Sequence, residues 1–359
     1  MRHFRIIIIL ILAVNCWAQQ REEKDKKKSF SGYPYAFYSD ETSFGIGGFA
    51  FYVFNKKKDQ ATSPDRLMFN SLYSFKKQFL LVTQPEFNFK RDKYKIEIPL
   101  NLKKWPSEFY GIGKNPGTEN LEEYTAQIIE LETLAQVNFY KQWHLGLNLS
   151  YWHNIILESG EGGQLDNKTV PGAEKFQVFG FGPVLRRDSR DNDLLSKNGS
   201  FLELKSSFYE KFWGDYDFQK YEVDLRKFVS VTEDNFIGFQ GLFTYINGIA
   251  PFQKLPDMGN KMRGFKNAHF VDNHMFVSKL EFRTYPLNGK TLSRFGGVLF
   301  TEIGQVASEI NDFQLNKTEI SYGWGIRYLL IPDQGLTLRF DMGFSKDGVE
   351  ITFSGLEEF

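Results

Sequence analysis

Histidine and cysteine, two residue types that often carry enzyme chemistry, are sparse in this chain, and the spacing of the histidines fits no catalytic site. The histidines beyond the N-terminal segment stand at positions 144, 153, 269 and 274. None of these spacings is one by which histidines share a metal ion, and no serine-elbow motif is present. The glycine pairs 45/47 and 180/182 lie in extended segments rather than at a strand-to-helix turn, so they do not indicate a dinucleotide site. The sequence therefore predicts no enzyme, no metal and no cofactor.

One loop does combine residues that could bind or anchor. Met262-Arg263-Gly264-Phe265 lies in a long connection between two extended segments. A loop arginine is ordinarily a solvated charge, but a guanidinium can also bind a carboxylate fork to fork. Gly264 permits a positive φ or a close backbone approach, and Phe265 can pack against a wall. The elements around the loop decide between these alternatives.

The chain begins with the features of a secretory signal peptide. Two arginines precede an apolar run at 6–14 that is too short to cross a membrane, and small residues stand at −3 and −1 of a cut after Ala18. Residues 1–18 are therefore the predicted signal peptide. The alternative is a lipoprotein with lipid on Cys16, although Asn15 before it fits that alternative poorly. Cys16 is the only cysteine, so no disulfide is expected in the exported chain.

Composition favours a membrane chain without membrane helices. Aromatic residues make up 17% of the chain, and 31 residues are glycine. No stretch after the signal peptide approaches the roughly 20 apolar residues that a membrane helix needs. Basic and acidic residues are balanced at 44 each, which gives no reason to expect nucleic acid as a partner. An exported, aromatic-rich chain of this kind is typical of an outer-membrane β-barrel.

An alternation with a period of two supports this interpretation. Every second side chain is apolar, and those between are polar or charged, in 94–103, 220–227, 320–328 and 336–344. A soluble sandwich would alternate as well, but its apolar faces would have to pack around a limited core. Here the apolar face is rich in aromatic residues in strand after strand. We therefore expect that face to meet outer-membrane lipid.

The pattern predicts an all-β, sixteen-stranded antiparallel transmembrane barrel. The expected strands are 33–39, 43–55, 66–77, 78–91, 93–103, 122–137, 142–157, 175–188, 199–211, 217–229, 235–248, 273–285, 294–304, 318–330, 335–345 and 347–357. Longer loops are expected near 104–121, 158–174, 188–198, 248–272 and 305–317. Residues 19–32 are charged and lack a core-forming pattern, so they form a predicted disordered lead-in to the barrel at 33–359.

Several motifs occur in the order found in a known family. They are the tip Met262-Arg263-Gly264-Phe265, LFTEIG at 299–304, SYGWGIR at 321–327 and GLTLRFDMGF at 335–344. They resemble the (V/I)-R-G-(Y/F) sixth extracellular loop, the F-x-D-x-G strand, the S-x-G-x-G-x-R strand and the closing P-L-R-F-D-x-G strand of the BamA/TamA-type bacterial surface antigen family. The resemblance implies outer-membrane assembly barrels with a long loop folded into the lumen.

The same resemblance assigns roles to further residues. It implies a loop-anchoring wall that consists of Phe300, Glu302, Gly304, Arg339 and Asp341. The segment RDSRDN looks like the family's D-x-R-D-N turn, with motif residues Asp188, Arg190, Asp191 and Asn192. The final Phe359 resembles the family's C-terminal sorting residue. Glu302 replaces the usual aspartate, and the chain leaves no room for POTRA domains, so we expect the barrel-only branch.

The strand period predicts how the wall would hold the loop. Phe300 and Glu302 lie two residues apart and therefore share the inward face, and Asp341 is also inward. A loop folded into the lumen would bring Arg263 towards Glu302, where a fork-to-fork pair fixes orientation and register. A purely structural role for this contact stays open, since breaking a buried ion pair costs several kcal/mol.

The resemblance implies a function in inserting or translocating a client protein or lipid through a weak seam between the first and last strands. Gly348 and Gly355 flank 349–353, which shortens the pairing of the last strand. The alternative is a passive pore, or a structural or surface-binding barrel without insertase activity. The expected location is the bacterial outer membrane, and the partners so implied are client outer-membrane proteins or accessory lipoproteins.

Overall fold

The computed structural model describes the greater part of the chain from Ser29 onward. The described residues are 8–10, 29–39, 43–54, 62–113, 117, 120–286, 292–331 and 335–359. The predicted signal peptide lies outside these residues except for the three-residue strand β1 (Ile8–Leu10), and so does most of the predicted lead-in. Within the described part, no helix is long and apolar enough to cross a membrane.

The chain divides into two compact units, and both consist of antiparallel strands. The first unit contains β2 (Ser29–Ser39), β3 (Ser43–Phe54), β4 (Asp65–Ser74), β5 (Phe79–Phe89), β6 (Tyr94–Glu97), β7 (Leu100–Phe109), β8 (Glu122–Tyr140) and β9 (Trp143–Ser159). Two strands, β10 (Phe176–Asp188) and β11 (Gly199–Tyr209), run from one unit into the other. In the first unit, β2 to β5 pair antiparallel in order, and β8 pairs with β9. Between them, β6 and β7 both pair with β5, and β6 also pairs with β8.

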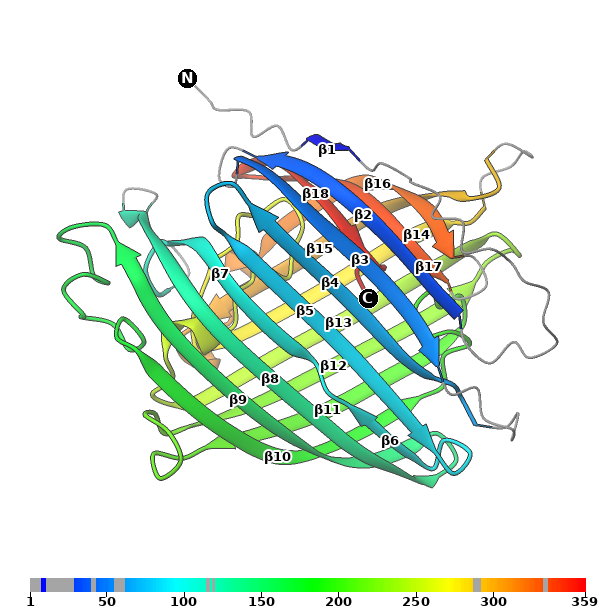
Figure 1. The fold of residues 1–359 in the computed structure, drawn as a ribbon, viewed down its shortest axis with the longest axis horizontal. Coiled ribbons are helices and arrows are strands. Elements are labelled where there is room, and N and C mark those ends of the chain that lie inside the picture. The colour runs from blue at the N-terminus through cyan, green and yellow to red at the C-terminus, as the bar shows by residue number, and fades with distance from the viewer. Residues whose placement is uncertain are drawn as a thin grey trace. The chain divides into compact units, whose positions relative to one another are not determined.

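The second unit carries the predicted site and is the simpler of the two. It contains β12 (Phe218–Ser230), β13 (Asn235–Gly248), β14 (His274–Thr284), β15 (Phe295–Ala307), β16 (Glu319–Ile331), β17 (Leu336–Ser345) and β18 (Gly348–Gly355). Short 3-10 turns η2 (Phe252–Lys254), η3 (Ile310–Asp312) and η4 (Leu315–Lys317) interrupt its loops. Each strand pairs antiparallel with the next, as the labels of Figure 1 allow the reader to follow.

The observed strands follow the predicted ones closely, and the differences have local causes. The strand predicted over 93–103 is interrupted at Ile98-Pro99, so that it forms β6 and β7. Pro99 has no N–H to donate to a neighbour, and the N–H of Ile98 turns to the carbonyl of Pro85 at 3.1 Å. With these halves counted as one strand, the described strands from Ser29 onward number sixteen. β2 begins at Ser29, inside the segment predicted as the lead-in.

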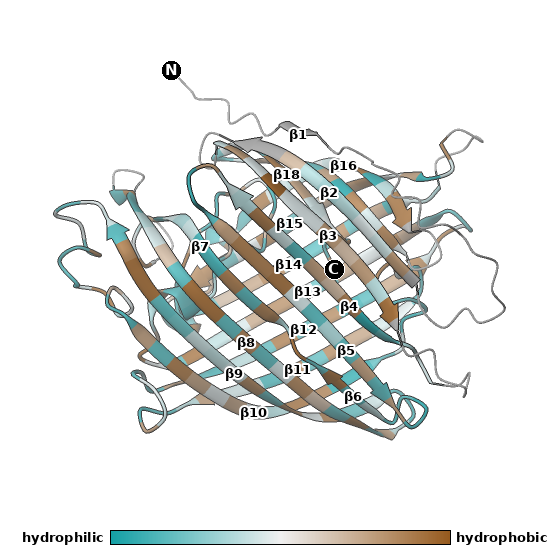
Figure 2. Cartoon of the chain, in the orientation of Figure 1, coloured by the Kyte–Doolittle hydropathy of each residue, from teal (hydrophilic) through white to brown (hydrophobic). Residues whose placement is uncertain are grey.

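Burial along the strands is the reverse of that in a soluble protein. In β14 the charged side chains of Lys279, Glu281 and Arg283 are 2%, 0% and 0% exposed. Their apolar neighbours Leu280 and Phe282 are 47% and 41% exposed. Figure 2 shows hydrophilic and hydrophobic residues alternating along the strands. Buried charges next to exposed aliphatic and aromatic side chains indicate that the exposed face meets lipid.

A lysine scan along the exposed face tests this assignment. Leu280→Lys places a charge at the middle of β14, where we expect a cost of about 2–4 kcal/mol because the site lies at mid-membrane. Val229→Lys places the same charge one residue from the end of β12, where we expect about 0–1 kcal/mol. Unfolding in lipid vesicles measures both, and equal costs would contradict a lipid-facing assignment.

Candidate functional site

The connection between β13 and β14 is folded back on itself. Asp257 and Gly113 each form a bridge with Val271. The N–H of Met258 bonds to the carbonyl of Phe270 at 2.9 Å, and the Asp257 carboxylate accepts the N–H of Ala268 at 2.7 Å. These contacts close residues 257–271 into a compact loop, whose tip carries Arg263.

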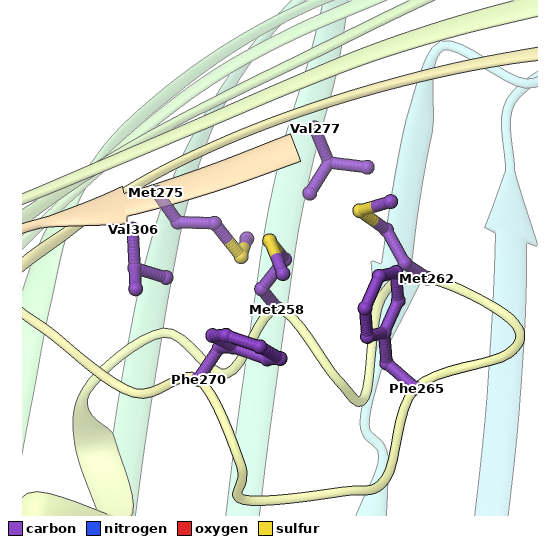
Figure 3. Close-up of a cluster of buried hydrophobic side chains, with 7 residues drawn as sticks. All are labelled: Met258, Met262, Phe265, Phe270, Met275, Val277 and Val306. Carbon is purple, nitrogen blue, oxygen red and sulfur yellow. The ribbon is translucent and has the colours of Figure 1, made fainter. Parts of the chain in front are cut away.

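Apolar side chains attach this loop to the buried face of its own sheet. Figure 3 shows Met258, Met262, Phe265 and Phe270 of the loop around side chains of β14 and β15. The strand residues of the cluster are Met275, Val277 and Val306. All are buried, and methionine side chains adapt well to an irregular gap of this kind. The cluster fixes the height of the loop above the sheet, which brings Arg263 within reach of the charged strand residues.

Arg263 lies among three carboxylates from three strands. Its backbone N–H donates to Glu302 Oε2 at 2.7 Å, and its Nε and Nη2 donate to Glu302 Oε1 at 2.8 and 2.6 Å. Nη2 also donates to Glu281 of β14, and Nη1 lies 3.4 Å from Asp341 Oδ2 of β17. We call Arg263, Glu281, Glu302 and Asp341 the arginine lock. The lock ties one loop to β14, β15 and β17.

The wall around the guanidinium is shaped to admit it. The Arg263 guanidinium lies 3.5 Å from the centroid of the Phe300 ring, a cation–π contact that also excludes water. A Cβ on Gly304 would come within 2.5 Å of the Met262 sulfur, so this position on β15 has no room for a side chain. Gly264 has a φ of +86°, which favours glycine.

The loop tip also meets β17 backbone to backbone. A Cβ on Gly343 would lie 2.5 Å from the nitrogen of Gly264. Ser345 Oγ donates to the Gly264 carbonyl at 2.5 Å. The positive φ of Gly264 turns the chain so that both contacts are possible. Any larger residue at either glycine would push the tip away from the sheet.

Additional charges balance the lock. Arg283 Nε donates to Glu281 Oε2 at 2.6 Å, and Arg327 Nη1 donates to Asp341 Oδ1 at 2.5 Å. Arg339 Nη1 lies 3.2 Å from Asp341 Oδ2. Burial by itself would lower the pKa of Arg263, but Glu281, Glu302 and Asp341 outweigh it and raise the pKa. The guanidinium therefore stays charged, and within the described residues no group of acidic, His or Cys side chains is arranged to hold a metal ion.

The structure brings together the five predicted anchoring residues and adds others. Phe300, Glu302, Gly304, Arg339 and Asp341 all lie around the loop or the partners of the lock. The sequence prediction missed Glu281, Arg283 and Arg327 as members of this network. A signal existed for the first two, because Lys279, Glu281 and Arg283 stand at alternate positions of one strand and so share its polar face.

The predicted turn motif forms a separate structure between β10 and β11. Arg190 binds Asp188 through two bonds of 2.9 and 2.7 Å, and its guanidinium lies 4.7 Å from the Phe201 ring centroid. Asp191 accepts two backbone N–H groups that close the turn, at 3.0 and 3.1 Å. Asn192 accepts two more at 2.8 and 2.9 Å. These four residues shape a turn through contacts with one another, with its backbone and with Phe201 of β11.

The lock predicts strong, non-additive mutational effects. Arg263→Ala leaves buried carboxylates short of a partner, so we expect a loss of about 3–5 kcal/mol in the free energy of unfolding. Glu302→Gln should also destabilise, and the double variant should lose much less than the sum because both changes delete one shared interaction. Unfolding by urea in detergent measures the cycle.

A surface pair supplies the control for that cycle. Lys346 and Glu319 form an ion pair in which the lysine is exposed, and its loss should cost under about 1 kcal/mol. Additive, similarly small effects at Arg263 and Glu302 would show that the loop arginine is not held by the wall.

The loop should also respond to pH through Asp257. Burial raises the pKa of this carboxyl from 3.8 to about 6, and backbone N–H groups and Lys261 offset only part of that effect. The folded loop therefore binds the proton more tightly than the unfolded chain. The associated stability is fully present below about pH 4 and is lost as pH rises through 6, by at most about 3 kcal/mol.

Asp257→Asn tests that prediction, since an amide does not titrate in this range. The variant should gain stability over the wild type above pH 6 and lose the dependence on pH between 4 and 7. Thermal unfolding in detergent across that range measures it. If the wild type became more stable from pH 4 to pH 7 and Asp257→Asn did not, the pH dependence would have the opposite sign and would exclude this account.

Comparisons with known proteins agree with this architecture. A model of the Omp85 superfamily domain matches residues 68–354. No curated protein matches the chain in sequence. Among solved structures, BamA from Haemophilus ducreyi lacking POTRA domains 1-3 has a TM-score of 0.60 at 10% identity, over 98% of this chain and 74% of that one. CdiB from Acinetobacter baumannii has a TM-score of 0.56 at 11% identity, over 98% of this chain and 65% of CdiB.

At such low identities the two structures establish the fold, an antiparallel β-barrel, and the matched domain establishes the family. The domain match spans most of the chain and includes the loop tip, β14, β15, β16 and β17. The chain belongs to the Omp85 superfamily of bacterial outer-membrane β-barrels.

Proposed function

We propose that this barrel inserts or translocates a client protein or lipid at the edge of its last strand. The observation that carries the proposal is the shortness of β18. It has 8 residues, whereas β17 has 10 and β16 has 13. Fewer residues offer fewer backbone hydrogen bonds, so the outer edge of β18 binds any neighbouring strand weakly. A client strand can compete for such an edge by adding to the sheet.

The arginine lock supports the proposal by joining three strands of the second unit. Its three carboxylates come from β14, β15 and β17, and one guanidinium joins them. These three strands are thereby fixed to the loop, while none of the three lock carboxylates lies on β18. A wall fixed in this way beside a short last strand is a suitable arrangement for admitting a client without unfolding the barrel.

Family membership supports the same proposal at a coarser level. The solved structures that share the fold include a BamA and a CdiB. The partners proposed here are outer-membrane lipid and client outer-membrane proteins, with accessory lipoproteins delivering the client. We assign no chemical step to the lock, because its guanidinium and its carboxylates neutralise one another.

The second candidate is a passive pore or a structural barrel. It is favoured by charged pairs that line the polar face of the second unit. Lys220 Nζ lies 2.7 Å from Glu222, and Arg226 lies 2.5 Å from Asp224. Such a wall would suit the passage of ions without any client.

Reconstitution separates the two candidates. We expect vesicles that contain the barrel to fold a urea-denatured outer-membrane protein several-fold faster than empty vesicles, measured by protease protection and heat-modifiable migration. Gly355→Val should slow this activity, because a Cβ there meets no atom within 4 Å and the β-branched residue favours an extended, better-paired β18.

Gly48→Val is the matched control. A Cβ at Gly48 also meets no atom within 4 Å, but the residue lies in β3 rather than at the end of the last strand. It should leave client folding unchanged. Ion conductance in planar bilayers without any acceleration of client folding would favour the passive pore instead.

A further inference from the structure

The backbone turns away from the direction of β18 after that strand. β18 ends at Gly355, Leu356 adopts a φ of +69°, and its N–H donates to the carbonyl of Thr337 at 2.9 Å. This turn directs Glu357, Glu358 and Phe359 onto the polar face of the second unit. Phe359 is buried there.

The alternation in β18 shows what the turn accomplishes. Val349, Ile351 and Phe353 are exposed, so an extended continuation would give the same exposed face to residues 357 and 359. Glu357 would then carry its charge into lipid, at a high cost in free energy. The turn at Leu356 instead places both glutamates on the charged side of the sheet.

Each glutamate meets a prepared set of partners. Glu357 accepts a bond from Arg327 Nε at 2.9 Å and another from the Tyr285 hydroxyl. Glu358 accepts a bond from Lys279 Nζ at 2.5 Å and another from Arg339. Burial alone would raise the pKa of Glu358, but Lys279 and Arg339 outweigh it and hold the pKa below its ordinary value.

Phe359 makes a separate set of contacts on this face. The Arg283 guanidinium lies 4.7 Å from the centroid of the Phe359 ring, and Phe228 lies 5.9 Å from it, centroid to centroid. The Phe359 carbonyl oxygen accepts a bond from Arg283 Nη2 at 3.2 Å. Gly238 leaves space for the ring, because a Cβ there would come within 3.1 Å of it.

Charge counting shows that this site requires an acidic ligand. The connected network contains five cations, which are Arg263, Lys279, Arg283, Arg327 and Arg339. Its side-chain carboxylates are Glu281, Glu302, Asp341, Glu357 and Glu358. Without the two tail glutamates, four buried cations and the half-buried Arg339 would face three carboxylates. Unpaired buried charges are costly, so the vacated site would attract an acidic group.

We propose that the polar face of β12 to β17 is a binding site for an acidic peptide segment, in which two carboxylates are followed by an aromatic residue. The chain's own Glu357-Glu358-Phe359 occupies it and thereby stabilises the arginine lock. Asp341 is the link to the lock, because it contacts Arg263 and also Arg327 and Arg339, the partners of the tail. Arg283 forms a second link, since it contacts both Glu281 and Phe359.

Chymotrypsin digestion of the folded wild type is the first test. The peptide bond after Leu356 should be cut roughly a hundredfold more slowly in the folded barrel than in the heat-unfolded chain, with mass spectrometry as the readout. Heat-modifiable migration in gels confirms that the barrel is folded. Cleavage at equal rates in both forms would overturn the proposal, whatever happens in any variant.

A second variant tests the link to the loop. Glu357→Gln with Glu358→Gln should accelerate the cleavage after Leu356 about tenfold or more and make the loop at 257–271 more sensitive to protease. Glu319→Gln, in the surface pair with Lys346, is the control and should change neither rate. If the double variant does not fold, the single change Glu358→Gln replaces it with the same expectation. Faster cleavage after Leu356 without any change in the loop would overturn the link to the lock.

A peptide added to the double variant tests the site as a receptor. The peptide Leu-Glu-Glu-Phe with an amidated C-terminus should restore protection of the loop, and amidated Leu-Gln-Gln-Phe should not, because only the first supplies two side-chain carboxylates to the cations. Equal restoration by both peptides, or by neither, would overturn the assignment of this face as an acidic-tail site. Client folding in vesicles is not measured in these tests, so their outcome does not depend on the proposed insertase activity.

Discussion

The second unit depends on one guanidinium held between carboxylates of three strands. Arg263 comes from a loop, and it contacts Glu281, Glu302 and Asp341 at points far apart in the sequence. Each of these charges would be costly if buried alone. Together they neutralise one another, and the Phe300 ring closes the remaining side. The position of the loop, the charges on the polar face and the order of the strands therefore depend on one another.

The environment on the other face makes such a network necessary. Lipid on the exposed side takes up the apolar side chains, so the buried side cannot be filled by a hydrophobic core of the usual kind. Apolar packing is limited there to patches such as the cluster around Met258 and Met262. Ion pairs and hydrogen bonds must supply the remaining specificity, and they do so with fixed directions that packing alone lacks. A loop bound in this way has one position rather than many.

The sequence alone was enough to predict the features that follow from periodicity. Alternation identified the strands and assigned Phe300 and Glu302 to one face, and the motif order pointed to Arg263 as their partner. It could not assign neighbours across strands, because these follow from register. In the structure Glu281 pairs with Phe300 across β14 and β15, and Lys279 pairs with Glu302. That register places Glu281 beside the Arg263 guanidinium, and no pattern within one strand contains the information. The break at Pro99 and the turn at Leu356 were missed for a similar reason. Each depends on a backbone hydrogen bond to a residue of another strand, from Ile98 to Pro85 and from Leu356 to Thr337.

The short last strand and the buried tail are two aspects of one arrangement. Residues after Gly355 can either extend β18 or place their carboxylates against Arg327, Lys279 and Arg339, and the same backbone cannot do both. Extension would add pairing at the edge but would expose Glu357 on the lipid face. Docking satisfies the cations of the polar face and leaves β18 at 8 residues. The charge on two glutamates therefore limits how strongly the last strand can hold a neighbour, and it connects that edge, through Asp341, to the loop at the centre of the lock.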